Sequence, residues 1–388
     1  MSKFLKFTIL AIVLFLFLFL ALTEYDKLIV GKDASDAALY DQLDNFSEAI
    51  NILRKEYVGP VDPTKLIHGA MRGMVSSLDD YSQFLEKGEY EELKSDAKGE
   101  FIGMGVEVSM KDGVLTVITP MDGSPAETAG IKPGDKIIKI DNNSTKSMSI
   151  TEAVEKMRGE PGTMIILTIW RDNVDKVFDV MLRRAMVETR SIKKAEILSG
   201  GIGYIKISEF QENTPRDLDE VLKVLESRGM TSLILDLRNN PGGLLETASD
   251  VAERFLPKDK VVVSIKSRLP KDSSTFRSSG RFYLKDYPLV VLVNAGSASA
   301  SEVVAGAIQD NKRGAIIGTK TFGKASVQAV VPLKDGSAIR FTSAYYYTPN
   351  GRLIKKEGII PDMVVESNDS KQLEAAIKYL GILNSDAK

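Results

Sequence analysis

The sequence predicts a multidomain α+β protein, in which a helical region, a small β-rich domain and an α/β domain follow an apolar N-terminus. Its 388 residues exceed the size of one ordinary domain. The apolar pattern changes along the chain from helical spacing, through β-branched runs broken by glycines, to alternating strands and helices. Hydrophobic residues make up 43% of the chain and charged residues 27%, a balance typical of globular proteins.

Residues 1–24 are expected to be a signal anchor or a signal peptide. Lys3 and Lys6 precede an apolar run over 7–22, close to the ~20 residues that span a bilayer. No good small-x-small cleavage signal ends the run, so an uncleaved anchor is favoured over a cleaved signal peptide. The positive residues place the N-terminus in the cytoplasm. We therefore expect an exported protein, anchored in the inner membrane with its folded part on the periplasmic or extracytoplasmic side, or soluble there if the segment is cleaved.

Residues 33–96 are expected to be mostly helical. Apolar side chains recur there at three- and four-residue spacing, at Leu39, Leu43, Phe46, Ile50 and Leu53. Gly59-Pro60 ends this first helix, because both residues break helices. A second helix around Thr64–Leu78 contains His68, for which a surface or packing role is favoured over a catalytic one.

Residues 97–185 predict a small β-rich domain with two helices. β-branched runs predict strands at 114–118, 136–140 and 164–169. Ser124-Pro125-Ala126 opens a short helix, and residues 150–157 have the spacing of a second. The turn Gly130-Ile131-Lys132-Pro133-Gly134-Asp135 leads into a strand.

Residues 186–365 predict an α/β domain, because strands and helices alternate. Buried strands are expected at 204–207, 233–237, 289–293 and 315–318, and helices after 214, over about 244–255 and over 302–309. Thr214 and Pro215 are the expected N-cap and first position of the first helix. The Ser/Lys/Arg-rich stretch 266–281 is expected to be a loop. Residues 366–388 predict a C-terminal helix and tail.

Composition excludes several kinds of chemistry. The chain has no cysteine, which excludes a thiolate nucleophile, disulfides, cysteine zinc sites and a lipidated cysteine. No metal constellation and no cofactor motif are visible. The net charge of −2 gives no reason to expect a nucleic-acid partner. With one histidine far from any motif, a serine paired with a lysine is the main route to a nucleophile.

A serine-rich turn, Gly296-Ser297-Ala298-Ser299-Ala300-Ser301-Glu302, follows the predicted strand at 289–293 and opens a helix. α/β sheets usually place their sites at such turns. Helix N-terminal N–H groups, such as that of Ala300, can receive an oxyanion, and the small residues let a substrate backbone approach closely. Ser299 and Glu302 also fit a capping box. The turn alone favours capping over catalysis.

Two other motifs change that balance. Lys324 lies in Thr321–Gln328 with no nearby carboxylate, so its amine can lose a proton more easily and act as a general base. Gln328 can hold that amine by a hydrogen bond. Taken singly, Lys324 fits a surface lysine and Gln328 an ordinary strand residue. The turn Arg238–Gly243 offers further backbone donors at Gly242 and Gly243, although alone it fits a tight connection.

The β-rich segment resembles a PDZ domain. The resemblance rests on Phe101-Ile102-Gly103-Met104-Gly105-Val106, on the Ser-Pro-Ala turn and on Gly130–Asp135 before a strand. It implies that the backbone at Gly103, Met104, Gly105 and Val106 binds a peptide's C-terminal carboxylate, while the peptide adds a strand to the sheet. The Gly-x-Gly alone is equally explained by a tight turn.

The chain as a whole resembles the carboxyl-terminal processing peptidases, also called tail-specific serine proteases. The motifs that carry the resemblance are Leu78–Leu85, the PDZ segment, Asp236–Gly243, Gly296–Glu302, Thr321–Gln328 and Thr348–Arg352. It implies Ser299 as nucleophile, Lys324 as base and Gln328 as supporting residue. It also implies an oxyanion hole formed by Ala300 with Gly242 or Gly243.

The resemblance further implies a catalytic domain related to the Clp protease and crotonase group. It implies protein substrates with accessible C-terminal tails, which the PDZ domain recognises while gating access, and a homodimer or higher oligomer formed through terminal helices. An adaptor protein is a further candidate partner. The chain departs from the family at Asp80, usually proline, and at Ala325, often glycine, where the added methyl narrows substrate clearance.

Two other functions remain open from the sequence. The first is a catalytically inactive PDZ scaffold that binds peptide C-termini in the cell envelope, and the intact Ser299, Lys324 and Gln328 argue against it. The second is acyl transfer on small thioesters by a crotonase-like fold, which an exported location and a PDZ domain disfavour. A serine protease with a Ser299–Lys324 dyad is therefore the main expectation.

Overall fold

The computed structural model describes residues 39–386 except 112, 122, 173, 175, 282–285 and 356. The expected anchor at 1–24 lies outside these residues. Within the described ranges, no helix is both long enough and apolar enough to cross a bilayer. The chain divides into two compact units, Met1–Ser77 and Leu78–Lys388.

The first unit contains two described helices, as the sequence predicts. Residues 39–56 are helical, and α2 covers Pro63–Ser76. Asp62 caps α2, because its side chain accepts a hydrogen bond from the Thr64 N–H at 2.9 Å. The apolar side chains of the first helix are exposed, including Leu39, Leu43, Phe46 and Leu53.

The β-rich segment at the start of the second unit is an antiparallel sheet with strand order β3-β4-β5-β7-β8 and β6 beside β5. Its strands are β3 (Val106–Lys111), β4 (Val114–Pro120), β5 (Lys136–Ile140), β6 (Asn143–Ser144), β7 (Met164–Trp170) and β8 (Phe178–Arg183). The short helix α4 (Pro125–Thr128) and α5 (Ile150–Met157) accompany it. β3 forms one edge of this sheet. The segment has its own apolar core, centred on Ile137, Ile165, Leu167 and Ile169.

A two-stranded ribbon leads into and out of that segment. β2 (Glu100–Gly103) pairs antiparallel with β9 (Ala185–Glu188). Helix α3 (Lys87–Lys98) precedes the ribbon and ends at Gly99, whose φ of 75° is the left-handed conformation common after a helix.

The sheet of the α/β domain has the order β10-β11-β12-β15-β16-β19. Its strands are β10 (Ile192–Leu198), β11 (Ile202–Ile207), β12 (Ser232–Asp236), β15 (Leu289–Val293), β16 (Ala315–Gly318) and β19 (Met363–Val364). All pairs are parallel except β10 with β11. Asp236 lies opposite Leu292, so the turns that follow β12 and β15 leave the same edge of the sheet side by side.

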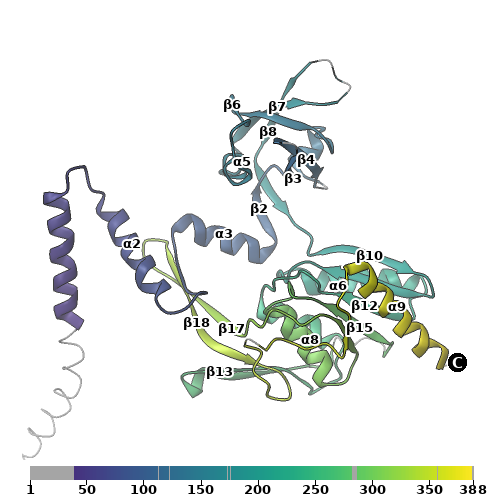
Figure 1. Cartoon of the computed structure of the whole chain (residues 1–388). Coiled ribbons are helices and arrows are strands. Elements are labelled where there is room, and N and C mark those ends of the chain that lie inside the picture. Colours follow the sequence, from purple (N-terminus) through teal and green to yellow (C-terminus); the bar gives the residue numbers. More distant parts are fainter. Residues whose placement is uncertain are drawn as a thin grey trace, which may run out of the picture. The chain divides into compact units, whose positions relative to one another are not determined.

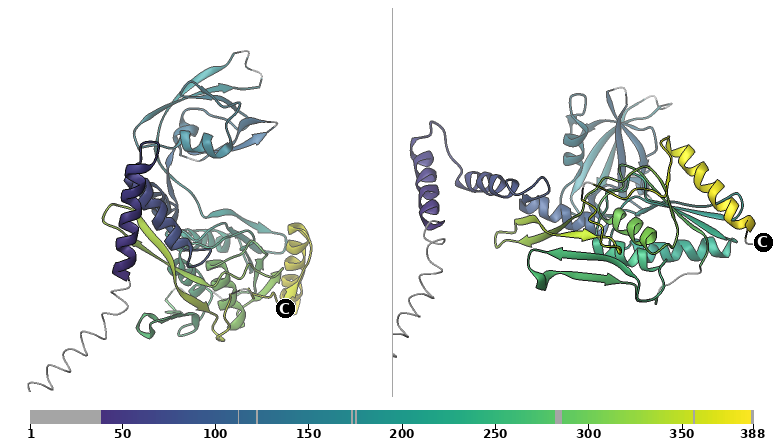
Figure 2. Two further views of the ribbon diagram at one scale, coloured as in Figure 1. Left: turned by 60° about the vertical axis from the view of Figure 1, so that its left-hand side comes forward. Right: turned by 60° about the horizontal axis from the view of Figure 1, so that its bottom comes forward.

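Helices cover both faces of this sheet (Figure 1). They are α6 (Thr214–Ser227), α7 (Leu245–Glu253), α8 (Ala300–Asp310) and α9 (Asp369–Asp386). Leu235 and Val291 face a core shared with α6, α7 and α8, whereas Ile234 and Val290 face α9. This alternation follows from the two-residue period of a strand. The yellow helix α9 and the green helix α8 therefore lie on opposite sides of the sheet (Figure 2).

A second sheet of the α/β domain has the order β1-β18-β13-β14, with β17 also paired to β18. Its strands are β1 (Gln83–Leu85), β13 (Val261–Ser267), β14 (Ser274–Arg277), β17 (Ser326–Pro332) and β18 (Ala338–Tyr347). Because β1 pairs with β18, the turn at residues 79–82 lies beside the middle of β18. Residues from the N-terminal third of the chain thereby join the second sheet of the α/β domain.

Two local expectations were wrong. Residues 266–281 are not simply a loop, because they contain the last two residues of β13 and the whole of β14. The two strands pair as an antiparallel hairpin. β14 carries the exposed residues Ser274 and Thr275, so it lacks the apolar signal of a buried strand. Asn213 stands at the N-cap of α6, and Thr214 is its first residue.

Candidate active site

Ser299 occupies the turn that joins β15 to α8. β15 ends at Val293 and α8 begins at Ala300. The backbone of Ser299 has φ 53° and ψ −114°, a conformation that residues with a β-carbon adopt only when the surrounding structure holds them there. Similarly strained strand-to-helix turns present the nucleophilic serine of α/β hydrolases at the end of the sheet.

The structure distinguishes Ser299 from its two serine neighbours. Ser297 Oγ donates to the Leu237 carbonyl at 2.8 Å, and Ser301 Oγ donates to the Asn240 carbonyl at 2.9 Å. Both of these serines are fully buried, whereas Ser299 keeps 9% of its surface exposed. In the described part of the chain, no backbone carbonyl binds the Ser299 hydroxyl. Of the three, Ser299 is the serine whose hydroxyl a substrate can reach.

The turn after β12 packs directly against the serine turn. The Ala298 N–H donates to the Asn240 carbonyl at 3.0 Å. A β-carbon at Gly242 would lie 2.9 Å from Ser299 Cβ and 3.1 Å from the Ala300 nitrogen. Gly242 also has φ +116°, which disfavours any side chain. Glycine at 242 is therefore required by the close approach of the two turns.

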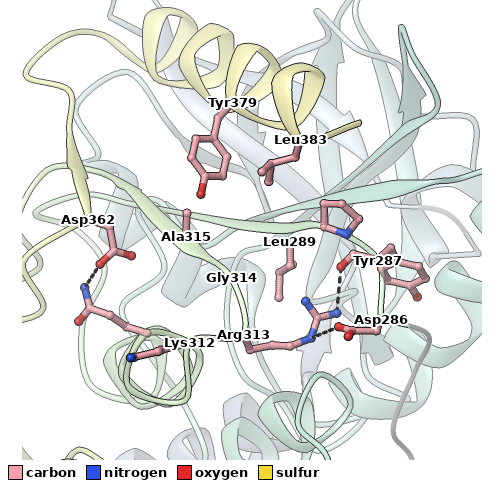
Figure 3. A pocket seen from close by; sticks show the side chains of 12 residues that line it. Asp286, Tyr287, Leu289, Lys312, Arg313, Gly314, Ala315, Asp362, Tyr379 and Leu383 are labelled. Carbon is pink, nitrogen blue, oxygen red and sulfur yellow. Dashed lines mark hydrogen bonds and ion pairs between the residues drawn. The ribbon is translucent and has the colours of Figure 1, made fainter. Parts of the chain in front are cut away.

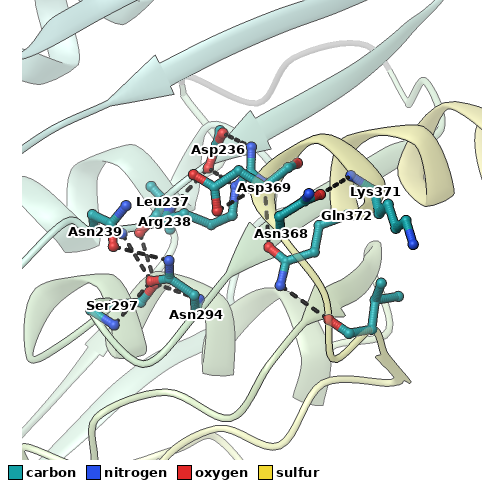
Figure 4. A network of polar contacts seen from close by, with 12 residues as sticks. Asp236, Leu237, Arg238, Asn239, Asn294, Ser297, Asn368, Asp369, Lys371 and Gln372 are labelled. Carbon is teal, nitrogen blue, oxygen red and sulfur yellow. Dashed lines mark hydrogen bonds and ion pairs between the residues drawn. The ribbon is translucent and has the colours of Figure 1, made fainter.

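Side-chain amides hold the same two turns together. The Asn239 N–H donates to Asn294 Oδ1 at 3.0 Å, and Asn294 Nδ2 donates back to Asn239 Oδ1 at 3.0 Å (Figure 4). Ser297 Oγ accepts from the Asn294 N–H at 3.0 Å. The junction is thus rigid around the nucleophile candidate.

A buried ion pair supports the glycine turn and joins it to α9 (Figure 4). Arg238 Nη2 lies 2.5 Å from Asp236 Oδ2, which also accepts from the Tyr204 hydroxyl at 2.6 Å. Arg238 Nη1 donates to the Asp369 carbonyl at 2.6 Å and to Gln372 Oε1 at 3.3 Å. Burial raises the pKa of Tyr204, and its hydrogen bond to Asp236 raises it further.

Two backbone N–H groups at the junction, those of Gly243 and Ala300, have no acceptor among the described residues. The Gly242 N–H, in contrast, donates to Asn240 Oδ1 at 2.9 Å. The Phe210 N–H donates to the Gly242 carbonyl at 2.8 Å and holds the chain in place. This pattern favours Gly243 over Gly242 as the partner of Ala300 in an oxyanion hole.

The carboxylate of Glu302 ties the serine turn to the lysine loop. Its Oε2 accepts from the N–H groups of Ser299 and Lys324, each at 2.9 Å. Its Oε1 accepts from the Gly323 N–H at 2.8 Å and from the Thr321 hydroxyl at 2.5 Å. The side chain is fully buried, and burial raises the pKa of the carboxyl against the effect of the four hydrogen bonds. Glu302 thus positions both Ser299 and Lys324.

The surroundings of Lys324 make its ammonium group easier to deprotonate. Burial lowers the pKa of its ammonium group, and the positive charge of Arg340 lowers it further. No carboxylate of the described residues lies within ion-pair distance of its Nζ. Nζ lies 4.8 Å from the centre of the Tyr81 ring, and within the described chain no hydrogen bond joins it to Ser299. The two loops meet, but the amine rests over Tyr81.

Gln328 and Tyr346 complete the surroundings of the dyad candidates. Gln328 Nε2 donates to Thr342 Oγ1 at 2.9 Å, while its Oε1 is buried without a partner. The pKa of Tyr346 is raised to about 12, mainly by burial. A hydrogen bond with the Ser299 side chain acts in the opposite direction and lowers it. Thr342 and Tyr346 carry no local sequence signal, because one is a single strand threonine and the other is one of three consecutive tyrosines.

The loop before β3 in the PDZ-like segment is packed closely against Ser124. Gly105 has φ +71°, and a β-carbon there would lie 2.2 Å from Ser124 Cβ. The Gly105 carbonyl accepts from the Ser124 hydroxyl at 3.0 Å, and the Met104 carbonyl accepts from the Ala126 N–H at 2.8 Å. The loop leads into the edge strand β3, which begins at Val106. The carbonyls of Met104 and Gly105 in this loop already accept hydrogen bonds from within the segment.

A cavity of about 580 Å³ lies elsewhere in the α/β domain (Figure 3). It is lined by Leu289 and Ala315, which begin β15 and β16, and by Tyr379 of α9. Ser299 follows the opposite, carboxyl end of β15, so this cavity is separate from the serine turn. The described residues contain no cluster of side chains suited to bind a metal ion.

Comparison with known proteins adds three family matches. Residues 201–365 match Peptidase family S41, residues 116–171 match the PDZ domain, and residues 21–88 match the activating protease CtpB N-terminal domain. A protein of Bacteroides fragilis NCTC 9343 that is assigned to the S41 proteases has a similar fold, with 18% identity and a TM-score of 0.54. That likeness covers 86% of this chain and 97% of the other.

Two relatives are similar over most of their length. A carboxy-terminal-processing protease of Bartonella bacilliformis is 42% identical over 331 residues, which cover 84% of this chain and 76% of the relative. The carboxy-terminal processing protease CtpB of Bacillus subtilis is 36% identical over 330 residues, which cover 84% of this chain and 68% of the relative.

Proposed function

The chain belongs to the carboxy-terminal-processing proteases of peptidase family S41, and from this premise we propose how its residues carry out the reaction. It is a serine-type endopeptidase that cleaves protein substrates near their C-termini. The observation that carries our assignment of the nucleophile is the contrast among the three serines, since the hydroxyls of Ser297 and Ser301 are committed to backbone carbonyls and that of Ser299 is not.

Lys324 is the proposed general base. Its neutral amine takes the proton of Ser299 Oγ as that oxygen attacks the scissile carbonyl carbon. The Lys324 amine must leave the Tyr81 ring to reach the hydroxyl, and catalytic hydrogen bonds of this kind often close only with substrate present. Glu302 keeps the backbones of Ser299 and Lys324 together throughout, because it accepts hydrogen bonds from both N–H groups.

The N–H groups of Gly243 and Ala300 are the proposed oxyanion hole. They have no acceptor within the described chain and lie where the glycine turn meets the serine turn. Collapse of the tetrahedral intermediate transfers the proton from Lys324 to the leaving amine and leaves an acyl ester on Ser299. A water molecule then attacks the ester, with Lys324 again as base, and restores the free serine.

The PDZ-like segment is the proposed binding site for substrate C-termini. β3 is an edge strand, and a substrate tail can therefore extend the sheet. Amides from Gly103 to Val106 would receive the terminal carboxylate. We further propose that this binding gates access to Ser299.

Localisation and assembly belong to the same proposal. The basic and apolar segment at 1–24 supports export and anchoring in the inner membrane, or release into the periplasm after cleavage. Exposed apolar side chains on the helix at 39–56 support a homodimer or higher oligomer. An adaptor protein that delivers substrates is a further proposed partner.

Proteolysis of a tagged protein tests the assignment. The substrate is a folded fluorescent protein with an unstructured tail that ends in apolar residues, and the control substrate ends in two aspartates. We expect the full-length protein to shorten the first substrate faster. Ser299→Ala and Lys324→Ala should each abolish cleavage, with similar losses because the two groups act as one unit. Full activity in either variant would refute the dyad.

A further inference from the structure

A second cavity, of about 210 Å³, adjoins the loop that carries Lys324. Its walls come from the turn at residues 79–82, from residues 323–326, from β18 and from Lys355. Because β1 pairs with β18, the turn before β1 lies against this strand, and the Thr342 N–H donates to Ser82 Oγ at 3.4 Å. The cavity is therefore formed by segments that are distant in sequence, and it lies beside the proposed base.

Two polar side chains of this cavity have no partner among the described residues. Ser326 Oγ is buried without a hydrogen bond, and only 5% of the surface of Ser326 is exposed. The Asp80 carboxylate also lines the cavity, is exposed, and makes no ion pair or hydrogen bond within the described chain. Buried polar atoms are normally hydrogen-bonded, so Ser326 Oγ points to a ligand with a polar group. Beside a carboxylate, that group is best a donor that carries a positive charge.

Two other charged side chains of the cavity are already bound. Asp79 Oδ1 accepts from the Tyr81 N–H and from Ser82 Oγ, each at 2.9 Å. Lys355 Nζ donates to the Tyr345 hydroxyl at 2.9 Å and lies 4.5 Å from the centre of that ring. The charges of Asp79 and Lys355 are opposite, so together they leave the cavity neutral.

Asp80 therefore determines the net charge of the cavity when the base is ready to act. Lys324, which also lines the cavity, is neutral in that state, and Asp79 and Lys355 balance each other. The uncompensated carboxylate of Asp80 gives the cavity a net negative charge, which favours a cationic group.

One wall of the cavity already holds an amine. Lys324 Nζ lies 4.8 Å from the centre of the Tyr81 ring, and the face of an aromatic ring attracts an ammonium group. In the proposed reaction this amine leaves Tyr81 to reach Ser299. Its departure frees a position that suits a second ammonium or guanidinium group.

The proposed reaction also indicates which part of the substrate reaches this cavity. Lys324 gives its proton to the leaving amine, so that amine must come within hydrogen-bond reach of Nζ. The oxyanion lies at the N–H groups of Gly243 and Ala300 instead. The residues that follow the scissile bond therefore pass closest to the lysine loop and its cavity.

We propose that this cavity is a subsite for a lysine or arginine side chain in the first two residues after the scissile bond, with Asp80 as its specificity-determining residue. The cationic group takes the place over Tyr81 that the Lys324 amine leaves. It donates a hydrogen bond to Ser326 Oγ and is attracted by the Asp80 carboxylate. This inference rests on the proposed Ser299–Lys324 dyad.

Cleavage-site mapping and paired peptides test the subsite. Casein is digested with the full-length protein, and mass spectrometry identifies the cleaved bonds. We expect lysine and arginine to be enriched in the first two positions after these bonds. Two internally quenched peptides are then built on one cleaved sequence, with lysine or norleucine at the enriched position. Norleucine keeps the length of the side chain but lacks the amine, and we expect kcat/KM to be about 3- to 10-fold higher for the lysine peptide.

Variants of the cavity separate charge recognition from a structural effect. Asp80→Asn should reduce the preference for lysine to less than about 2-fold, while the norleucine peptide is cleaved as by wild type. Asp80→Lys should reverse the preference, so that a glutamate peptide is cleaved faster than the lysine peptide. Ser326→Ala should weaken the preference about 2- to 3-fold. Asp272→Asn is the matched control, since Asp272 is an exposed carboxylate outside the cavity, and it should leave the preference unchanged.

The outcomes separate this inference from the proposed function. Equal kcat/KM for the lysine and norleucine peptides, or a preference that persists in Asp80→Asn, would overturn the subsite. Enrichment of lysine and arginine only before the cleaved bond would overturn its place on the leaving-group side. In each case, an inactive Ser299→Ala variant would leave the dyad itself standing. Full casein hydrolysis by Ser299→Ala would instead overturn the dyad, and the subsite with it.

Discussion

Replacing Glu302 by glutamine tests how much the shared carboxylate contributes. Glutamine offers one oxygen where glutamate offers two, while four donors converge on this site. If the amide nitrogen faces Ser299 and Lys324, two buried N–H groups lose their acceptor, at about 1–3 kcal/mol each. If the amide nitrogen faces Gly323 and Thr321, the Thr321 hydroxyl can turn and accept a hydrogen bond from it. Only the Gly323 N–H then loses its acceptor. The second orientation is cheaper, and we expect a destabilisation of about 1–3 kcal/mol.

The activity of Glu302→Gln should fall more than its stability suggests. The lost hydrogen bond belongs to the loop that carries Lys324, and a displacement of ~1 Å can cost about 100-fold in rate. We expect kcat on casein to fall about 100-fold, KM to change little, and Tm to fall by roughly 2–4 °C per kcal/mol. Glu253→Gln is the matched control, since this buried glutamate accepts two hydrogen bonds from Ser279 far from the serine turn. A Glu302→Gln variant with kcat within about 2-fold of wild type would refute the role of Glu302.

Three further predictions follow from the same contacts. Activity should rise with pH as Lys324 loses its proton, at a pH below its ordinary pKa of 10.5. Arg340→Met removes a positive charge that lowers the pKa of Lys324, so it should move this rise to higher pH. A pH–kcat curve that does not move in Arg340→Met would contradict this effect. Gly242→Ala should lower kcat about 100- to 1,000-fold by displacing the Ala300 N–H, whereas Gly88→Ala, with open space around its β-carbon, should leave kcat unchanged in the same casein assay. Arg238→Met should lower the free energy of unfolding in urea by about 3–5 kcal/mol, because it leaves Asp236 buried without its cation. A loss below ~1 kcal/mol would contradict this cost of an unpaired buried carboxylate.

The strands and helices of the α/β framework could largely be predicted from the sequence. The structure matches the expected bounds at β5, β15, β16 and α5, because buried strands are continuous apolar runs and α5 has clear helical spacing. β14 was missed because most of its side chains are polar and exposed. The other strand of the hairpin, β13, pairs with β18, which lies about 80 residues later in the chain.

Contacts at the candidate site could be predicted where one motif holds both partners. Ser299 and Glu302 lie within one short turn, and their local spacing predicts the helix cap that the Glu302 carboxylate makes. The extension of that carboxylate to Lys324, and the choice between Gly242 and Gly243, depend on how distant loops meet. Thr342 could not be found from sequence, since only the pairing of β1, β17 and β18 brings it beside Ser82 and Gln328.

Covalent labelling of the full-length protein with a fluorophosphonate probe, located by peptide mass spectrometry, tests the Ser299–Lys324 dyad most directly. We expect the probe on Ser299 and not on Ser297 or Ser301, with a labelling rate that drops at least 100-fold in Lys324→Ala while Lys320→Ala labels normally. Labelling of Ser297 or Ser301 would contradict the choice of nucleophile, and undiminished labelling of Ser299 in Lys324→Ala would contradict the role of the lysine as its base.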